Sequence, residues 1–311
     1  MSSNEKTNNQ LEQDKATDNS KPIFVSPLPT DERCLSCLRN SYERLMTKFE
    51  FSEEQRERFQ KQYNRITQDG TIKIGHKKQR ELSAEFRHVA GVDDLYAAEK
   101  ELSNRVALGL YDIWKPRLVS FPNPELISLR LAIAGNIMDY GVHHDFDLEE
   151  TVNSVITARL AIDDSAKLLD AVKRSEKLLV IGDNAGEIVF DKLMIETINH
   201  KSVYYAVRGG VVLNDVTVRD AREVGIDRIA TVVSNGYNAP ATVLSACSQE
   251  FLDHFYSADL IIAKGQGNFE SLYGLGDPRI YHLLMAKCHV VAEHLDVPKG
   301  SYIIVKQGLL W

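Results

Sequence analysis

Residues 179–190, LVIGDNAGEIVF, set an apolar run directly against an acid and an amide. A short apolar run that ends in a turn of small residues is typical of a buried strand leading into a helix. Asp183 and Asn184 stand where this strand should end, and Glu187 opens the expected helix. The stretch therefore predicts one strand–helix unit of an α/β sheet, with polar groups at the carboxyl end of the strand.

Similar runs rich in Val, Ile and Tyr follow, and each ends in glycine or a polar turn. They are SVYYAVRG (202–209), RIATVVSNG (228–236) and ADLIIAKGQG (258–267). Helical patterns lie between them, for example EIVFDKLMIETINH (187–200) and TVRDAREVG (217–225). This alternation predicts an α/β fold: a three-layer α/β/α domain over residues 176–311 with a mostly parallel sheet. The runs HVVAEHLDV (289–297) and SYIIVKQG (301–308) are candidates for the last strands.

The chain before this domain has a different character. Residues 1–24 are polar and too poor in apolar groups to offset the entropy of ordering, so we expect a disordered tail. Residues 25–175 read as an all-helical region without a convincing strand. The main patterns there are SEEQRERFQKQYNRI (52–66), PELISLRLAIAGNIMDYGV (124–142) and LEETVNSVITARLAIDDSAKLLDAVKR (148–174). In the second pattern Pro124 fits a first helical turn, and the helix should end near Gly141.

The amino-acid composition and net charge exclude some classes of function. The 311 residues carry a net charge of −7, with 43% hydrophobic and 26% charged residues. Such an acidic chain lacks the basic surface that nucleic acid or an anionic membrane would require. No apolar run approaches the roughly 18 residues of a membrane span, and the polar N-terminus lacks the apolar core of a secretory signal. We expect a cytoplasmic protein that binds neither nucleic acid nor membrane.

Polar groups gather at the expected strand ends, where open parallel sheets bind ligands. Asp183, Asn184 and Asp215 are oxygen donors without a nearby His or Cys, a set that suits Mg²⁺ or Mn²⁺. Arg208 and Lys264 could hold a phosphate. Backbone N–H groups at the glycine-rich start of the next helix would add to that. A metal beside a phosphate clamp favours phosphoryl transfer or phosphate-ester hydrolysis. The structural alternative is that the Asp-Asn pair only caps a helix or forms a turn.

Several separated motifs resemble the damage-control phosphatase family, first catalogued as a domain of unknown function. They are GDNAGE (182–187), RGGVVLNDVT (208–217), VVSNG (232–236) and KGQGNFESL (264–272). Upstream, CLSC (34–37) and AIAGNIMDYG (132–141) resemble its cysteine-bearing, mainly prokaryotic subfamily. The resemblance covers residues 25–311. It implies a helical region packed on an α/β/α domain and a metal-dependent phosphatase acting on small phosphometabolites such as sugar phosphates.

The resemblance also assigns roles by position. The metal ligands of the family fall on Asp183, Asn184 and Asp215. Its phosphate- and substrate-contacting Lys-Gly-x-x-Asn motif falls on Lys264, Gly265 and Asn268, and a later lysine falls on Lys287. Mn²⁺ is the expected ion, with Co²⁺, Ni²⁺ and Mg²⁺ as alternatives.

The expected mechanism leaves the nucleophile open. Either a metal-activated water or Asp183 itself attacks phosphorus. Glu187 orients a water or a sugar hydroxyl, Arg208 binds phosphate, and Asn136 is either a substrate contact or a helix-packing residue. We take Asp183, Asn184, Asp215 and Lys264 as the catalytic set.

Other functions remain open on the residues alone. A non-catalytic protein that binds a metal or a phosphometabolite could use the same sheet edge. A binder of the phosphometabolite alone would not need the metal ligands, so their presence favours catalysis. A methyltransferase would need a G-x-G-x-x-G loop, which GDNAGE does not supply. A redox protein would place its Cys-x-x-Cys after a strand, whereas Cys34 and Cys37 lie in helical sequence. These two thiols either start a helix, form a redox pair, or join Cys247 and Cys288 at a metal.

Overall fold

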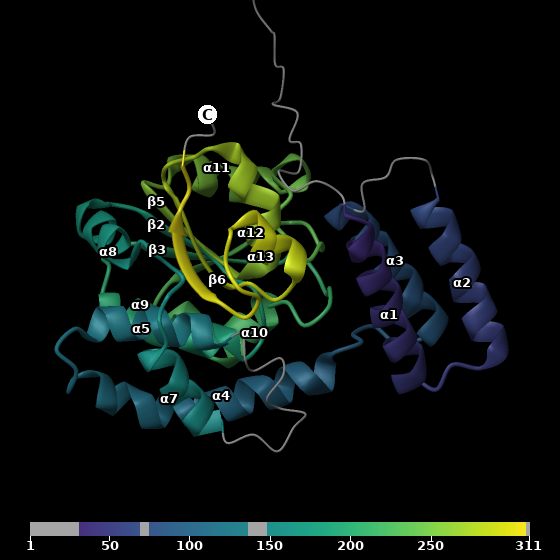
Figure 1. The fold of residues 1–311 in the computed structure, drawn as a ribbon, viewed down its shortest axis with the longest axis horizontal. Coiled ribbons are helices and arrows are strands. Elements are labelled where there is room, and N and C mark those ends of the chain that lie inside the picture. The colour runs from purple at the N-terminus through teal and green to yellow at the C-terminus, as the bar shows by residue number, and fades with distance from the viewer. Residues whose placement is uncertain (1–30, 69–74, 136–147, 309–311) are drawn as a thin grey trace, which may run out of the picture.

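A computed structural model describes residues 31–68, 75–135 and 148–308. A seven-stranded sheet crosses the body of the molecule in the order β1-β7-β6-β5-β2-β3-β4 (Figure 1). Neighbouring strands are parallel except β6 and β7, which pair antiparallel. The strands are β1 (Ile162–Asp163), β2 (Leu178–Ile181), β3 (Val203–Val207), β4 (Thr231–Ser234), β5 (Leu260–Lys264), β6 (Ile280–Met285) and β7 (Tyr302–Lys306).

Helices cover both faces of the sheet. On one face, alternate strand residues such as Val180 and Ile262 pack with α4, α5, α8, α9 and α10. On the other face, the intervening residues such as Ile181 and Ala263 pack with α11, and the β6–β7 end packs with α12 and α13. This two-residue alternation is what a pleated strand buried on both faces requires. The predicted three-layer α/β/α architecture is therefore confirmed. The helices in question are α4 (Ala97–Leu118), α5 (Pro124–Ala134), α8 (Ser165–Arg174), α9 (Glu187–Ile198), α10 (Val218–Glu223), α11 (Gln249–Ser257), α12 (Gly265–Leu272) and α13 (His289–His294).

Strand β2 lies in the interior of the sheet, with β3 on one side and the central strand β5 on the other. Ile181, its last residue, is opposite Ala206 of β3 and Ala263 of β5. The three strands run in the same direction, so their carboxyl ends meet at one edge. The residues that follow β2, β3 and β5 are thereby brought together, as the sequence predicted.

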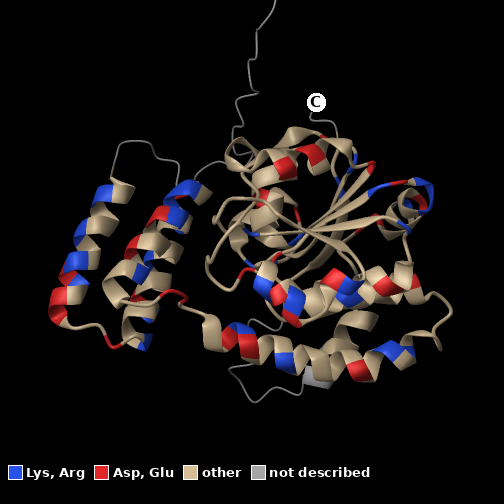
Figure 2. Cartoon of the chain, turned by 180° about the vertical axis from the view of Figure 1, so that it is seen from behind, with Lys and Arg blue, Asp and Glu red and all other residues tan. Residues whose placement is uncertain are grey.

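A separate three-helix unit precedes the sheet. It consists of α1 (Glu32–Lys48), α2 (Glu53–Thr67) and α3 (His76–Ala90), and it has its own aromatic core. In that core Phe86 stacks on Phe51 at 4.7 Å and meets the edge of Phe59 at 5.0 Å between ring centroids. Figure 2 shows Lys, Arg, Asp and Glu along the outer sides of these helices, while the central strands are mostly free of charge. The expected helical N-terminal region is therefore present.

The C-terminal strands differ from the sequence expectation. HVVAEHLDV does not form a strand: residues 289–294 are helix α13, and the strand next to β5 is β6, residues 280–285. A short apolar run does not by itself distinguish a strand from a buried helix turn, and β6 carries a histidine that weakened its apolar signal. SYIIVKQG does form the last strand, β7.

The region before residue 176 holds one strand that the periodicity did not reveal. The segment 148–174, read as helical, contains α7 (Leu148–Thr157) and α8 separated by the two-residue edge strand β1. So short a strand has no detectable alternation of its own. The predicted tail, the helix end near Gly141 and Asn136 lie outside the described residues.

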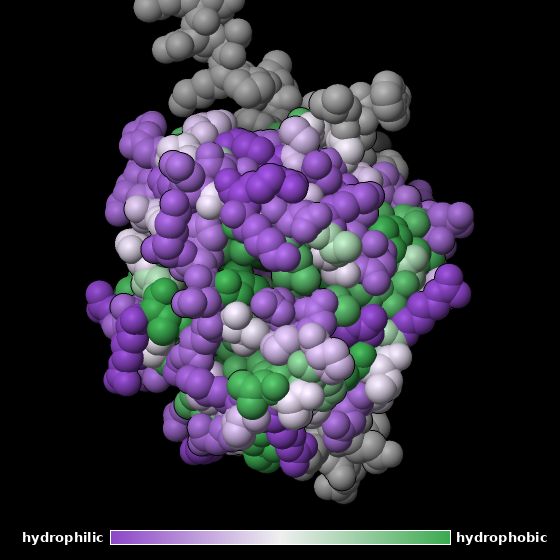
Figure 3. Space-filling model, turned by 90° about the vertical axis from the view of Figure 1, so that its left-hand side faces the viewer, coloured by the Kyte–Doolittle hydropathy of each residue, from purple (hydrophilic) through white to green (hydrophobic). Residues whose placement is uncertain are grey.

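The described part of the chain contains no helix that is both long and apolar enough to cross a bilayer. Hydrophilic residues cover most of the face at the left of Figure 1, with apolar groups scattered among them (Figure 3).

Candidate active site

Two backbone segments at the carboxyl edge of the sheet pair with each other and create the site. Residues 184 and 215 form an isolated antiparallel bridge. The N–H of Val216 donates to the carbonyl of Asp183 at 2.9 Å, and the N–H of Ala185 donates to the carbonyl of Asn214 at 2.9 Å. This pairing places the side chains of Asp183, Asn184 and Asp215 next to one another, and all three are buried. The three residues predicted as metal ligands are therefore neighbours.

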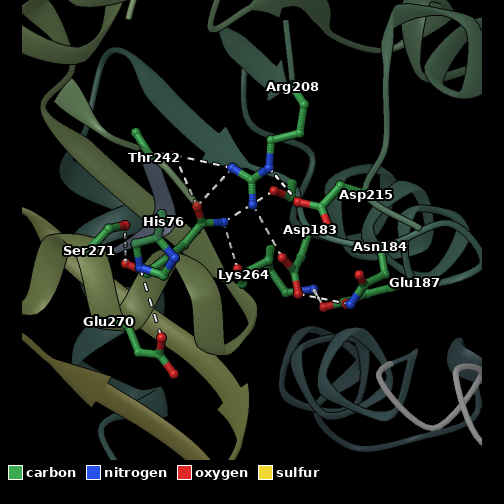
Figure 4. A network of polar contacts seen from close by, with 12 residues as sticks. His76, Asp183, Asn184, Glu187, Arg208, Asp215, Thr242, Lys264, Glu270 and Ser271 are labelled. Carbon is green, nitrogen blue, oxygen red and sulfur yellow. Dashed lines mark hydrogen bonds and ion pairs between the residues drawn. The ribbon is translucent and has the colours of Figure 1, made fainter. Parts of the chain in front are cut away.

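Arg208, which directly follows β3, joins the two aspartates (Figure 4). Its Nε donates to Asp215 Oδ2 at 2.5 Å, and its Nη2 donates to Asp183 Oδ1 at 3.3 Å. Its Nη1 donates to Asn268 Oδ1 at 3.0 Å and to Thr242 Oγ1 at 3.3 Å. These contacts engage four of the five N–H groups of the guanidinium. Arg208 is only 1% exposed, so it acts as a fixed positive charge between the carboxylates.

Lys264, the last residue of β5, is the second buried cation of the site. Its Nζ donates to the carbonyl of Ala132 at 2.9 Å, to Glu187 Oε1 at 2.7 Å and to Asp191. The ammonium group has three hydrogens, and protein oxygens accept all of them. The sequence suggested a direct phosphate contact for Lys264; in this structure the side chain instead holds Glu187 and Asp191 in place.

Glu187 begins α9 and connects the lysine to the aspartate pair. Asn184 Nδ2 donates to Asp183 Oδ2 at 2.8 Å and reaches Glu187 Oε2 at 3.4 Å. The backbone of Glu187 is covered by Gly135 at the end of α5, where a Cβ atom would lie 2.7 Å from the Glu187 Cα. Close packing of α5 on α9 thus fixes the glutamate below the aspartates.

Asp191 and Tyr205 extend this network and were not among the predicted site residues. Tyr205 of β3 donates its hydroxyl to Asp191 Oδ2 at 2.7 Å, and both side chains are fully buried. A sequence signal did exist for Asp191, because it stands four residues after Glu187 and so shares its face of α9. An acidic pair at that spacing among the apolar residues of the first turns of α9 indicates a buried polar site.

The start of α12 lies directly against the aspartates. Gly265 has φ +76°, and a Cβ atom there would lie 1.8 Å from Asp183 Oδ2. Asn268 Nδ2 donates to the carbonyls of Lys264 at 2.7 Å and Gly182 at 3.1 Å. Asn268 therefore links the ends of β2 and β5, while Gly265 lets the helix N-terminus approach Asp183.

Burial and the neighbouring negative charges raise the pKa of two acidic residues of the site, Asp183 and Glu187. Burial, with the charges of Asp215 and Glu187, raises the pKa of Asp183 well above its ordinary value, although Arg208 and Lys287 oppose the shift. Burial likewise raises the pKa of Glu187 to about 7 despite the neighbouring Lys264. In both residues burial, the largest cause, outweighs the opposing effect of the neighbouring cations on the pKa.

The donor set fits a divalent cation bound by hard oxygen ligands. Four buried carboxylates, Asp183, Glu187, Asp191 and Asp215, face two buried cations, Arg208 and Lys264. The buried cluster thus has a formal excess of two negative charges. Among the described residues no group of three or more His, Cys, Asp or Glu is arranged to hold a metal. A metal here would therefore rely on two carboxylates and the Asn184 amide oxygen, with water or substrate completing the shell.

The remaining predicted residues lie further out. Lys287 follows β6, and its backbone N–H donates to Gln266 Oε1 at 3.0 Å. Its charge acts on Asp183 and Glu187, as their pKa values show. Cys34 and Cys37 are exposed free thiols on α1, which does not follow a strand, and the half-buried Cys247 and Cys288 are also free.

Comparison with known proteins agrees with this geometry. A model of the damage-control phosphatase ARMT1-like domain matches residues 30–303. The chain is 41% identical over 221 residues to a damage-control phosphatase of Pyrococcus horikoshii, covering 70% of this chain and 76% of that protein. It is 32% identical over 222 residues to a damage-control phosphatase of Archaeoglobus fulgidus, covering 69% and 76%. The crystal structure of a DUF89 family protein from Pyrococcus horikoshii superposes with a TM-score of 0.81 and 33% identity, over 89% of this chain and 98% of that one.

Proposed function

The chain belongs to the damage-control phosphatase ARMT1-like family, and from that membership we propose that it is a phosphatase acting in metabolite repair. Its substrates would be small phosphorylated metabolites, including sugar phosphates. Hydrolysis would depend on a divalent cation, Mn²⁺ foremost. The observation that carries the proposal is the pairing of residues 183–185 with 214–216, which brings two aspartates and an asparagine together at the carboxyl edge of the sheet.

The excess of negative charge supports metal dependence. A divalent cation would be held by Asp183, Asn184 and Asp215 and would balance the two uncompensated charges of the cluster. When bound, the cation would polarise the phosphoryl group and lower the pKa of a coordinated water. Arg208 already holds both aspartates, which fixes their carboxylates before any ion arrives.

The protein's own groups would position the phosphate. The first-turn N–H groups of α12 begin at Gly265, beside Asp183, and can donate hydrogen bonds to the non-bridging phosphate oxygens. The Arg208 charge lies between the aspartates and attracts the phosphate to the same place. Both sources of positive potential are fixed in advance, so the transition state gains stabilisation without reorganisation of the protein.

The attacking group would be either a water or the Asp183 carboxylate. Asp183 is held by Arg208 through Oδ1 and by Asn184 through Oδ2, which fixes its orientation. Glu187 would orient a water or a substrate hydroxyl, and Lys264 and Asp191 set the position of that glutamate. A phospho-aspartate trapped during turnover would identify Asp183 as the nucleophile; uniform absence of one under rapid quench would favour water.

The decisive experiment is metal add-back. The protein is stripped of metal and assayed for phosphate release from a panel of sugar phosphates and p-nitrophenyl phosphate, with Mn²⁺, Mg²⁺, Co²⁺ or Ni²⁺ restored separately. We expect restored release, and a loss of at least about a hundredfold in Asp183→Ala. Asp170→Ala is the matched control, because Asp170 is an exposed aspartate on α8.

No release from folded protein with any of the four ions would contradict the proposal. Full activity in Asp183→Ala would leave a phosphatase but remove this site as its centre.

A further inference from the structure

The turn between β2 and α9 contains Asn184 and leads into Glu187, and one of its backbone N–H groups finds an acceptor in a distant helix. Within this turn Gly186 has φ +77° and ψ −50°, the region of the rare and strained γ-turn. The N–H of Gly186 donates to Asn104 Oδ1 at 2.7 Å, across 82 positions of sequence. The conformation of the turn is therefore tied to a side chain of α4.

Asn104 lies on α4, which packs against α9 (Figure 1), and its side chain is buried. The N–H of Gly186 needs an acceptor, so this contact fixes the amide with its oxygen toward the turn. The Nδ2 group is then buried, and it has no hydrogen-bond partner among residues 31–68, 75–135 and 148–308. An unpaired amide of this kind destabilises the folded chain. Asn104 therefore contributes through its one bond to the turn.

A second residue on the same face of α4 reaches the other segment of the site. Lys100 lies one helical turn before Asn104, and its Nζ is 3.4 Å from Asp220 Oδ2. The same carboxylate oxygen accepts from the backbone N–H of Thr217 at 2.8 Å and from its hydroxyl at 2.7 Å. Thr217 stands two residues after Asp215. Helix α4 thus holds both of the segments that form the isolated bridge of the site.

Other residues provide the apolar packing of α4. Ala107, Leu110 and Trp114 belong to the hydrophobic core between this helix and the sheet. A leucine at position 104 would have the branching of asparagine and would bury no unpaired amide, but it could not accept from Gly186. What asparagine adds at this position is its oxygen, and that oxygen holds the turn of the predicted metal ligands.

We propose that Asn104 is a positioning residue for the metal centre. Its hydrogen bond to Gly186 holds the turn in the shape that lets Asn184 join Asp183 and Asp215 around a divalent cation. Asn104 itself would touch neither the ion nor the substrate. The inference rests on the metal-dependent phosphatase proposed above, but the binding of the ion can be measured without turnover.

The test measures Mn²⁺ binding to the full chain after its metal has been removed. Free Mn²⁺ gives an electron paramagnetic resonance signal that is lost on binding, so a titration yields Kd directly. Asn104→Leu removes the acceptor, and we expect its Kd for Mn²⁺ to rise roughly three- to tenfold, the usual effect of one neutral hydrogen bond. The Mn²⁺ concentration that half-restores phosphate release should rise by the same factor. At saturating Mn²⁺, KM for the sugar phosphate should stay within about twofold of wild type, because substrate contacts are unchanged.

Two further variants separate the hydrogen bond from the packing. Asn104→Asp keeps an oxygen toward Gly186 and should recover most of the lost affinity. Ser103→Ala is the matched control, because Ser103 is the neighbouring buried polar residue of α4 and points in a different direction. Its Kd should equal that of wild type. A thermal melt of each metal-free variant shows whether it folds, and Asn104→Ala takes the place of Asn104→Leu if the leucine variant does not.

Each outcome decides the role of Asn104. A folded Asn104→Leu with the wild-type Kd would overturn it, and so would equal weakening in Asn104→Leu and Asn104→Asp, because the oxygen would then be irrelevant. If wild-type protein binds no Mn²⁺, the inference fails together with metal dependence. If Mn²⁺ binds and the variants behave as expected but no ester is hydrolysed, the proposed phosphatase fails and the positioning role stands.

Discussion

Gly265 is the residue whose backbone most tightly constrains the site. Its φ of +76° lies in the region that L side chains rarely adopt, and the space where a Cβ would stand is taken by Asp183. Glycine there allows two things at once: the sharp entry from β5 into α12, and the close approach of the helix start to the aspartate.

We expect Gly265→Ala to disable the site as well as weaken the fold. The positive φ costs about 1–3 kcal/mol of stability, and the added methyl must displace Asp183. Phosphate release should fall by at least about tenfold. Gly300→Ala is the matched control, since Gly300 has φ +89° with nothing within 4 Å of its Cβ position. Gly300→Ala should lower the melting temperature without lowering activity; wild-type activity in Gly265→Ala would contradict the geometry.

The residues of the site differ in how well their positions could be predicted from the sequence. Asp183, Asn184 and Asp215 could be predicted as neighbours, because adjacent parallel strands end at one edge. Thr242 and Asn104 could not, since they come from a loop and from helix α4, where no periodicity records the contact. The buried partners of Lys264 were also hidden, because sequence shows that a charge is present but not which way it points.

Strand β6 is the element that the sequence analysis missed, and its histidine helps to explain why. His282 lies fully buried in the strand with Phe269 at 5.2 Å and Tyr273 at 5.9 Å between ring centroids. The sequence indicated residues 289–297 as a candidate strand and did not single out IYHLLM, residues 280–285. The strand forms at residues 280–285 because Phe269 of α12 and Tyr273, directly after that helix, pack against the neutral imidazole of His282.

His282 should make the protein sensitive to acid. Burial lowers the pKa of His282 to about 3, whereas an unfolded histidine titrates near 6.5. Below pH 6.5 the unfolded chain takes up a proton that the folded chain does not, so the free energy of unfolding falls as the pH falls. By pH 4 this one group should remove roughly 3 kcal/mol.

The measurement is the melting temperature from pH 7 to pH 4 in wild type and in His282→Phe. The variant should show a shallower decline than wild type. His289→Phe, the same change at an exposed histidine, should keep the wild-type slope. Parallel declines in wild type and His282→Phe would rule out the buried imidazole as a cause of acid sensitivity.

At the scale of the whole molecule, two units with separate cores meet near the site. Sequence patterning predicted a helical region over residues 25–175 and an α/β domain over 176–311, but not that α1–α3 would form a core apart from the later helices. It did not predict their contact, in which Arg80 and His76 of α3 reach the loop after β4 and helix α12. Such contacts join residues more than 150 positions apart, as Arg80 and Asn238 are, and leave no local pattern.

Metal binding should stabilise the entire chain. An ion that binds only the folded state, present at one hundred times its Kd, adds about 2.7 kcal/mol, which for a protein of this size raises the melting temperature by roughly 4 °C. We expect this rise with Mn²⁺ in metal-stripped protein. It should be absent in Asp215→Asn and retained in Asp170→Ala. An equal rise in Asp215→Asn would place the ion elsewhere.

Arg208 also bears on how the protein could endure metal scarcity. The guanidinium already bridges both aspartates from within the chain, which holds their carboxylates together before any ion binds. Folding of the chain and binding of the metal ion can then occur as separate events. Molecules synthesised during metal starvation would persist as a dormant stock and become active when supply returns, without new synthesis.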